Sequence, residues 1–361
     1  MANIAPQFMA LNMSDKYPRV KVAVALLCYN NVDLLEQFLP KVIATVPNTP
    51  DYKIFVIDNA STDSTPEFLE QFRDNIEVIT VKINRGFTNG YKTGLAKIDA
   101  EIFCLLSSDV EVSENWIQPA IELFDNDPKV GVVQPKVRSW HEREKFEYAG
   151  ASGGFIDHLG FPFCRGRIFY DQETDTGQYD NNMEIFWASG ACFFVRAKLY
   201  EESGGLDDDF YAHMEEIDLC WRLKNIGYKI MVCPASTVYH IGGAVISYGS
   251  PEKTYRNHRN NLIMMVKNLP GKEVFPKILL RLILDSLAFA NMIVRGQIKA
   301  SFSIIHAHWN FLWNMRKWLR KRKELETLHV KPTTVGIYPK SIIVQYFLKG
   351  KKKFSDLDWT P

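Results

Sequence analysis

The sequence lacks several patterns that would each assign it to a particular class of protein. No Cys-x-x-Cys pair occurs among its six cysteines, which are scattered singly, so structural disulfides are not expected. The first residues contain no basic region followed by an apolar stretch, so we expect no signal peptide and a cytoplasmic location. No uninterrupted apolar run reaches roughly 18 residues, so no membrane-spanning helix is expected either.

The composition is that of a globular protein with an uneven distribution of charge. Of 361 residues, 46% are hydrophobic and 24% are charged, which excludes collagen-like, coiled-coil and wholly disordered chains. Residues 1–250 carry 22 Lys and Arg against 35 Asp and Glu, whereas residues 251–361 carry 21 against seven. The net charge of +1 therefore conceals an acidic body followed by a basic tail.

Short apolar segments alternate with segments of helical periodicity in the first third of the chain. Strands are predicted at 22–29, 52–57, 76–81 and 102–106, and helices at 33–46, 65–73 and 88–98. This alternation predicts an α/β fold with a mostly parallel sheet, in which ligands bind beyond the carboxyl ends of the strands. Polar clusters follow three of these strands, at 29–31, 58–59 and 107–111.

The pattern is less regular after residue 130. Strands are expected at 130–137, 193–195, 228–233 and 237–239, and a helix at 210–226. Residues 139–182 are rich in glycine, charge and aromatic side chains and have no clear period.

Two acidic groups are candidates for chemistry. Asp109 and Glu111 stand two residues apart after a strand, so in extended geometry both carboxylates face one Mg²⁺ or Mn²⁺ ion; the alternative is a solvated turn. Glu215, Glu216 and Asp218 fall on the first turns of a predicted helix, where neighbouring like charges raise the pKa of a general base. The alternative there is a favourable interaction with the helix dipole.

Two further segments have both a functional and a structural interpretation. The loop from Asn84 to Gly90 contains Arg85 and precedes a helix, so its amides can receive phosphate, although many such turns use glycine for geometry alone. His240 closes a strand, and a lone histidine is more often structural than a ligand.

The order and spacing of these segments carry more information than any one of them. The series CYNN, VIDNASTDST, NRGFTNGYKTG, SSDVEV, WASGACFFVR, GGLDDDFYAHMEEIDLCWR and YHIGGAVIS closely resembles the family 2 glycosyltransferases, which have the GT-A nucleotide-sugar fold. It is most similar to the bacterial branch that includes rhamnosyltransferases of surface-polysaccharide assembly. The resemblance covers Val22 to Leu262. It implies a Rossmann-like sheet flanked by helices and an inverting, metal-dependent transfer from a nucleotide-diphosphate sugar to a glycan or lipid-linked acceptor.

The resemblance also implies roles for individual residues. The nucleotide sugar is implied to contact Tyr29, Asn30, Asp58, Asn59, Asn84, Arg85, Gly86, Gly90, Ser108 and Asp109. A divalent metal, Mg²⁺ or Mn²⁺, is implied at Asp109, Glu111 and His240. The acceptor side is implied at Trp187, Ser189, Gly190 and Asp218, and Glu216 takes the place of the usual catalytic base.

Three positions depart from the family pattern. Ser107-Ser108 replaces the common Asn-Asn or Asp-Asp before Asp109, so fewer metal ligands are expected, and Glu111 replaces the second Asp. Glu216 replaces Asp and moves the carboxylate outward by about one methylene, ~1.5 Å. Glu215 or Asp218 is therefore an alternative base.

We expect three regions: an N-terminal tail (1–20), a catalytic domain (21–250) and a basic helical region (251–361). The catalytic domain is expected to comprise a nucleotide-binding half (21–128) and an acceptor half (129–250).

The basic helical region has features of a membrane-surface protein. Residues 274–294 are apolar apart from Lys277, Arg281 and Asp285, which fall on one stripe of a helix. Residues 302–319 contain three tryptophans and run into a cluster of Arg and Lys at 316–323. This combination predicts peripheral attachment to the inner face of the cell membrane, and packing on the catalytic domain or a dimer seam is the alternative.

Other classes of function fit less well. A Rossmann-type dehydrogenase shares the early strand–helix units but requires Gly-x-Gly-x-x-Gly after the first strand, where Cys28-Tyr29-Asn30-Asn31 stands. A non-catalytic sugar- or membrane-binding protein of the same fold is the alternative, and the retained acids at 109, 111 and 216 argue against it. No nucleic-acid-binding motif is recognised, so no nucleic acid is expected as a partner.

Overall fold

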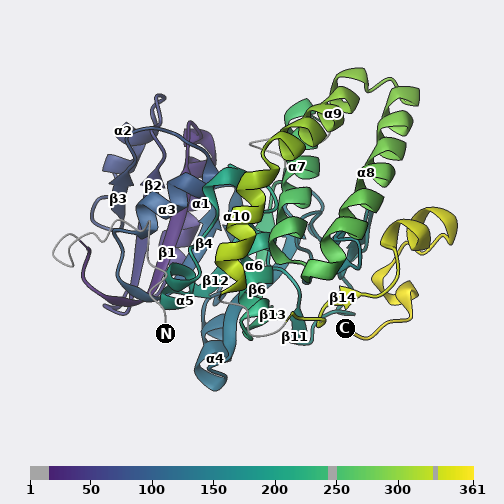
Figure 1. Ribbon diagram of the computed structural model, residues 1–361. Helices are drawn as coiled ribbons and strands as arrows, with labels where there is room; N and C mark the ends of the chain where they lie inside the picture. The colour runs from purple at the N-terminus through teal and green to yellow at the C-terminus, as the bar shows by residue number, and fades with distance from the viewer. Residues whose placement is uncertain (1–15, 243–249, 328–331) are drawn as a thin grey trace.

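The computed structural model describes residues 16–242, 250–327 and 332–361 (Figure 1). Most of the expected N-terminal tail, residues 1–15, and the end of the last motif, residues 243–247, lie outside the described residues. The first half of the main sheet is parallel and consists of β1 (Val20–Cys28), β2 (Tyr52–Asp58), β3 (Glu77–Thr80) and β4 (Ala100–Ser107) in the order β4-β1-β2-β3. The connecting helices are α1 (Val32–Thr45), α2 (Thr65–Glu70) and α3 (Phe87–Leu95). The predicted α/β alternation is confirmed.

The second half of the main sheet is mixed. β12 (Cys192–Arg196) pairs antiparallel with both β4 and β6 (Val130–Ser139), and β13 (Lys229–His240) pairs parallel with β6. β5 (Val110–Val112) and β11 (Met183–Ile185) pair antiparallel with β13. The sequence predicted two strands where β13 is one, because Pro234 to Ser236 interrupts the apolar pattern and the structure accommodates these residues as an irregularity. The helices of this half are α4 (Gln118–Asn126), α5 (Ala197–Glu202) and α6 (Glu215–Asn225).

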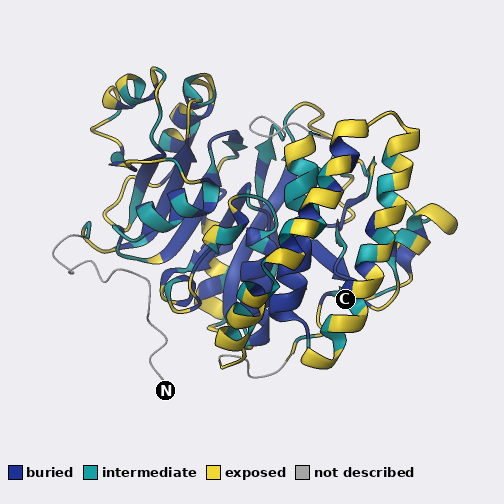
Figure 2. Ribbon diagram, turned by 45° about the horizontal axis from the view of Figure 1, so that its top comes forward, coloured by how far each residue is buried: buried dark blue, intermediate teal, exposed yellow. Residues whose placement is uncertain are grey.

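The hydrophobic core lies on both faces of the main sheet, whose central strands β1, β4 and β12 are buried over most of their length (Figure 2). Side chains alternate along β1, so Val22 and Val24 belong to one buried cluster and Ala23 and Ala25 to the other. The first cluster is completed by α1, α2 and α4, and the second by α3, α5 and α6. This burial on two faces explains why the strands read as continuous apolar runs.

A second, smaller sheet forms within the stretch that had no clear period. Its strands are β7 (Gly154–Asp157), β8 (Pro162–Cys164), β9 (Arg167–Ile168), β10 (Asp171–Gln172) and, from the C-terminal end of the chain, β14 (Ile337–Tyr338). Strands this short show no period of two, so the sequence gives no signal for them. β14 pairs in parallel with β7, which brings the last part of the chain beside residues 139–182.

The basic tail forms α7 (Pro251–Asn268), α8 (Gly271–Val294), α9 (Ile298–Trp313) and α10 (Met315–Glu326), so its predicted helical character is confirmed as far as residue 326. Beyond residue 326 the tail contains the short strand β14 and two short helical segments, Val344–Leu348 and Phe354–Leu357. Residues 262–266 of α7 are buried in the same cluster as α3, α5 and α6. α8 and α9 form a hairpin at one side of the molecule (Figure 1). No helix among the described residues is long and apolar enough to cross a membrane.

Candidate functional site

A cavity of about 470 Å³ lies between the end of the main sheet and the helices of the tail. Seven residues that the sequence singled out line it: Asp109, Trp187, Ser189, Gly190, Glu215, Glu216 and His240. Side chains from α7 and α8 also line it, among them Lys253, Asn261 and Arg281. Residues far apart in the chain therefore contribute to one site, which is placed where the α/β pattern predicted.

His240 lies between two carboxylates inside this cavity. Its Nε2 is 3.3 Å from Asp109 Oδ2, and its Nδ1 is 3.5 Å from Glu147 Oε1. Burial opposes the charge on His240, but Asp109 and Glu147 together raise the pKa of His240 well above its usual range. Burial raises the pKa of Asp109, but His240 and Ser107 outweigh burial and hold this pKa below its ordinary value.

The donor set of Asp109 and His240 fits a divalent metal that takes further ligands from a substrate, and such a metal would replace the proton that the raised pKa keeps on His240. Mg²⁺ and Mn²⁺ are usually held by one or two carboxylates and complete their shell with water and phosphate oxygens. Glu147, which the sequence analysis missed, faces the second ring nitrogen of His240 and so directs Nε2 toward Asp109. Within the described residues no group of three or more His, Cys, Asp or Glu side chains is arranged to hold a metal.

Glu111 does not join Asp109, contrary to the argument from extended geometry. Its carboxylate accepts a hydrogen bond from Trp140 Nε1 at 2.9 Å and forms an ion pair with Arg143. Glu111 lies opposite Tyr239 in the pairing of β5 with β13, whereas its neighbour Val110 lies opposite His240. Asp109 precedes β5, so the alternation of side chains along a strand does not apply to it.

The residues implied in nucleotide binding form a separate polar group at the ends of β1 and β2. Asp58 Oδ1 accepts from the Ser61 amide at 2.9 Å, and Asn30 Oδ1 accepts from the Thr62 amide at 2.7 Å. Ser108 accepts a hydrogen bond from Asn31. Tyr29 and Arg85 are exposed. The nucleotide-binding role of this group stays a prediction.

The loop from Asn84 to Gly90 is fixed against this polar group by packing as well as by hydrogen bonds. Asn59 Nδ2 donates to Asn84 Oδ1 at 3.1 Å and to the Gly86 carbonyl at 3.3 Å. Gly86 has a φ of +98°, and a Cβ there would lie 2.5 Å from the ring of Tyr211. A Cβ on Gly90 would lie 2.7 Å from Leu27. Both glycines are therefore required by close packing, whichever ligand the loop receives.

Helix α6 begins at Glu215 and not at Phe210, which corrects the predicted start. Tyr211, His213 and Met214 have positive φ, a conformation that interrupts a helix, and no periodicity argument could reveal it. Burial raises the pKa of Glu216 to about 7, and burial together with Glu216 raises the pKa of Glu215. A Cβ on Gly190 would lie 4.0 Å from the carboxyl carbon of Glu216, so the two residues are neighbours in the cavity wall.

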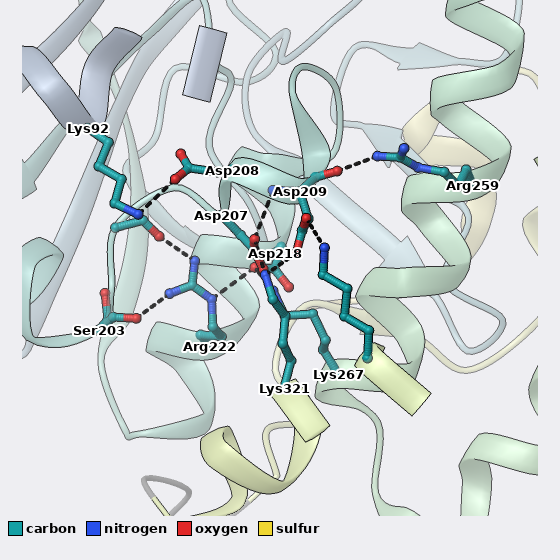
Figure 3. Close-up of polar contacts among 12 residues, drawn as sticks. Lys92, Ser203, Asp207, Asp208, Asp209, Asp218, Arg222, Arg259, Lys267 and Lys321 are labelled. Atoms are coloured by element: carbon teal, nitrogen blue, oxygen red, sulfur yellow. Dashed lines mark hydrogen bonds and ion pairs between the residues drawn. The ribbon is translucent and has the colours of Figure 1, made fainter. Parts of the chain in front are cut away.

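Asp218 has a structural role and does not line the cavity. Its Oδ2 accepts from Arg222 Nε at 2.9 Å and from Lys267 Nζ at 2.7 Å (Figure 3). Its Oδ1 accepts from Asn268 Nδ2 at 2.8 Å. The side chain is fully buried. Asp218 is therefore neither an accessible base nor an acceptor contact, in contrast to the interpretation of the sequence.

The other acceptor-side residues form the cavity wall. Trp187 Nε1 donates to the Phe155 carbonyl at 2.9 Å, and its ring packs against Gly154, where a Cβ would lie 2.2 Å away. Ser189 donates to the Ala149 carbonyl, and its amide donates to Gln134.

Several cavity residues were missed by sequence reasoning. They are Glu147, which faces His240, and the lining residues Arg167, Lys253, His258 and Asn261. Glu147 and Arg167 come from the stretch without a clear period, and the others from a helix where their residue types are unremarkable. Arg281 was noted only as part of a charged stripe. No sequence signal could have placed these residues together.

Comparison with known proteins agrees with the geometry. The sequence profile described as glycosyl transferase family 2 matches residues 23–204, half of the chain. The N-acetylglucosaminyl-diphospho-decaprenol L-rhamnosyltransferase of Mycobacterium tuberculosis is 24% identical over 243 residues, which cover 63% of this chain and 76% of that protein. The inactive polypeptide N-acetylgalactosaminyltransferase-like protein 5 of Macaca fascicularis is 27% identical over 244 residues, which cover 63% of this chain and 54% of that protein.

Among solved structures, Staphylococcus aureus TarS 1-349 in complex with UDP-GlcNAc has a TM-score of 0.56 at 16% identity, and the match covers 85% of this chain and 91% of that one. That likeness confirms the GT-A fold. With the family match over half of the chain, it also removes the dehydrogenase alternative. The chain therefore belongs to glycosyl transferase family 2 and is a glycosyltransferase of the GT-A fold.

Proposed function

We propose that this glycosyltransferase moves a sugar from a nucleotide-diphosphate sugar to a hydroxyl of a lipid-linked glycan acceptor, with inversion and with a divalent metal, in surface-polysaccharide synthesis. The observation that carries the proposal is one cavity that contains both the Asp109–His240 pair and Glu216, whose pKa is raised to about 7 by burial. A carboxyl group with that pKa is well matched to removing a hydroxyl proton near neutral pH.

The mechanism is a single displacement. Glu216 accepts the proton of the acceptor hydroxyl while the hydroxyl oxygen attacks the anomeric carbon and the bond to the diphosphate breaks on the opposite face. One displacement inverts the anomeric centre and needs no covalent enzyme intermediate. Asp109 and His240 would hold the metal, which when bound supplies positive charge beside the leaving diphosphate. Glu147 keeps the His240 ring oriented for this role.

A panel of nucleotide sugars tests the donor class. We expect one donor to raise the melting temperature, and to do so more strongly with Mn²⁺ than with EDTA. The expected stabilisation is about 2.7 kcal/mol at a donor concentration of 100 Kd. Release of nucleoside diphosphate from that donor should need the metal. A panel in which no nucleotide sugar shifts the melting temperature with Mn²⁺ present would contradict the proposal.

We also propose that the α8–α9 hairpin attaches the enzyme to a membrane surface. Arg281 and Asp285, which the sequence placed on a charged stripe of α8, are buried against the rest of the protein. Many large apolar side chains of both helices face outward instead: Phe275 and Trp313 are 77% and 76% exposed. Trp309 and Trp313 stack at a ring-centroid distance of 5.7 Å on the outside of α9. An apolar outer surface with tryptophans suits the lipid interface.

Some residues of the basic cluster at 316–323 bind other parts of the protein, and others are exposed. Lys317 and Lys321 form ion pairs with Asp209, and Arg322 donates to the Val266 and Leu269 carbonyls. Arg316, Arg320 and Lys323 are exposed. Only this second group is available to anionic lipid, so we expect a weaker electrostatic contribution than the sequence alone indicated.

The acceptor proposal follows from how the cavity and the hairpin are connected. Lys253 and Arg281 of the tail line the cavity together with Arg167 of β9, so positive charge is present on the side that the tail contributes. A diphosphate carries the complementary charge, and the Mycobacterium tuberculosis relative is named for an acceptor that carries a diphosphate and a decaprenol chain. In this arrangement the sugar lies near Glu216 while the lipid chain remains at the outer face of the hairpin.

Sedimentation with anionic liposomes tests the attachment. The double variant Trp309→Ser/Trp313→Ser removes the exposed tryptophans, and we expect it to lose most of the bound fraction at both low and high salt. Ile83→Ser is the matched control, because Ile83 is 60% exposed but lies outside the hairpin. Wild-type protein that stays in the supernatant would contradict attachment, and a wild-type dimer that the double variant dissociates would favour the dimer seam.

A further inference from the structure

The segment that precedes the proposed base is strained. Tyr211 has φ 65° and ψ −55°, His213 has φ 70°, and Met214 has φ 72° and ψ −6°. Residues other than glycine seldom adopt these conformations, and they persist only when the surrounding structure fixes them. Because α6 begins immediately afterwards, the path of this turn sets where Glu216 lies.

One side chain of the tail holds most of this turn. Asn260 of α7 donates through Nδ2 to the carbonyls of Phe210 at 3.0 Å, Ala212 at 3.0 Å and His213 at 2.7 Å. Asn260 is completely buried. The two hydrogens of one amide group therefore serve three carbonyls of neighbouring residues, so at least one hydrogen is shared between two carbonyls.

Charged side chains of the tail fix the acidic residues just before the turn (Figure 3). Asp207 accepts from Lys267 Nζ at 2.7 Å and from Lys321 Nζ at 2.5 Å. Asp209 pairs with Lys317 and Lys321, and its carbonyl accepts from Arg259. Lysines of α7 and α10 thus neutralise acidic residues at 207–209. This pairing explains part of the division between an acidic body and a basic tail in the sequence.

The same turn also contacts the loop implied in nucleotide binding. The Thr88 amide donates to the Tyr211 carbonyl at 3.3 Å, and the Tyr211 ring fills the space over Gly86. Asp208 pairs with Lys92 of α3 at 2.8 Å. The turn therefore lies between the Asn84–Gly90 loop on one side and the tail helices on the other.

We propose that Asn260 is a positioning residue for the transfer reaction: it holds the turn of residues 210–214 so that Glu216 faces the acceptor hydroxyl. The proposal rests on the function proposed above, because it takes Glu216 as the base. It assigns to the basic tail a second role, inside the active site, that is independent of any membrane. Asn260 itself does not line the cavity and need not touch a substrate.

The test compares Asn260→Ala with a matched variant. Asn225→Ala also removes a buried asparagine that bonds to backbone, since Asn225 donates to the Asn268 carbonyl and accepts from the Thr333 amide, but it does not touch the turn. We expect Asn260→Ala to lower kcat by about 100-fold, the loss typical of a catalytic group displaced by about 1 Å, with donor affinity unchanged. Asn225→Ala should lower the melting temperature with little change in kcat.

Hydrogen–deuterium exchange of residues 211–218 provides a readout that does not depend on activity. We expect faster exchange there in Asn260→Ala and not in Asn225→Ala. Equal kcat in the two variants, or unchanged exchange in Asn260→Ala, would overturn the proposal. If Asn260→Ala does not fold, Asn260→Ser replaces it: faster exchange and a lower kcat support the proposal, and unchanged values overturn it. A wild-type protein without transfer activity on any donor would instead refute the proposed function, and the exchange data would still decide the role of Asn260.

Discussion

Glu216→Gln is expected to lower kcat by about 10³-fold, within the range that general bases contribute, while donor affinity survives. Glutamine keeps the size and hydrogen-bonding capacity of the side chain but cannot accept the acceptor proton. Glu215→Gln is the matched variant, because Glu215 is adjacent and buried, and burial raises its pKa as well. Activity lost in Glu215→Gln and retained in Glu216→Gln would show that the neighbour is the base.

The raised pKa of Glu216 adds two pH-dependent results. The wild-type kcat should rise with pH through about 7, because the base must be ionised to act. Since the folded state binds this proton more tightly than the unfolded state does, the free energy of unfolding should fall as pH rises from 4.5 to about 7. Glu216→Gln removes this term, so we expect the inactive variant to be more stable than the wild type at pH 8. A loss of activity accompanied by a loss of stability would point to misfolding instead.

The parts of the fold that the sequence predicts well are those with long, regular patterns. β1, β2 and β4 are buried on both faces and read as uninterrupted apolar runs, and the helices between them have a clear period of 3.6. The polar residues at their ends could be placed near one another because the carboxyl ends of parallel strands share an edge. Asp109 and His240 meet there although 131 positions separate their numbers.

What the sequence could not predict depends on contacts between distant segments. The positive φ values of Tyr211, His213 and Met214 have no signature in the periodicity of the sequence. The sequence therefore predicts a helix from residue 210, whereas α6 begins at Glu215. The sequence offers Asp218 as an alternative to Glu216 for the base, because both are acids near the start of one helix. The ion pairs of Asp218 with Arg222 and Lys267 exclude it, and the pair with Lys267 joins residues of two different helices. The sequence also does not show which face of a helix packs against the protein. A charged stripe normally faces water, but here Arg281 and Asp285 face the protein and pair with each other at 3.6 Å.

Asp109→Asn is expected to abolish metal-dependent transfer, with a fall in kcat of about 10³-fold if electrostatic stabilisation of the leaving group is lost. Asparagine has nearly the same shape, so the hydrogen bond with Ser107 and the surrounding packing can persist. The variant removes the negative charge that pairs with His240 and that would attract a cation. The fold should therefore survive while the response to metal does not.

The variant Glu111→Gln tests whether Glu111 binds the metal together with Asp109. Because Glu111 is engaged by Arg143 and Trp140, we expect this variant to keep the Mn²⁺-dependent rise in melting temperature with nucleotide sugar, whereas Asp109→Asn loses it. Both measurements should be made with circular dichroism to confirm that each variant is folded. If Glu111→Gln also loses the Mn²⁺ effect, Glu111 must leave Arg143 when the metal binds, and the site comprises both carboxylates. If Asp109→Asn retains the effect and a kcat near that of the wild type, Asp109 does not hold the metal.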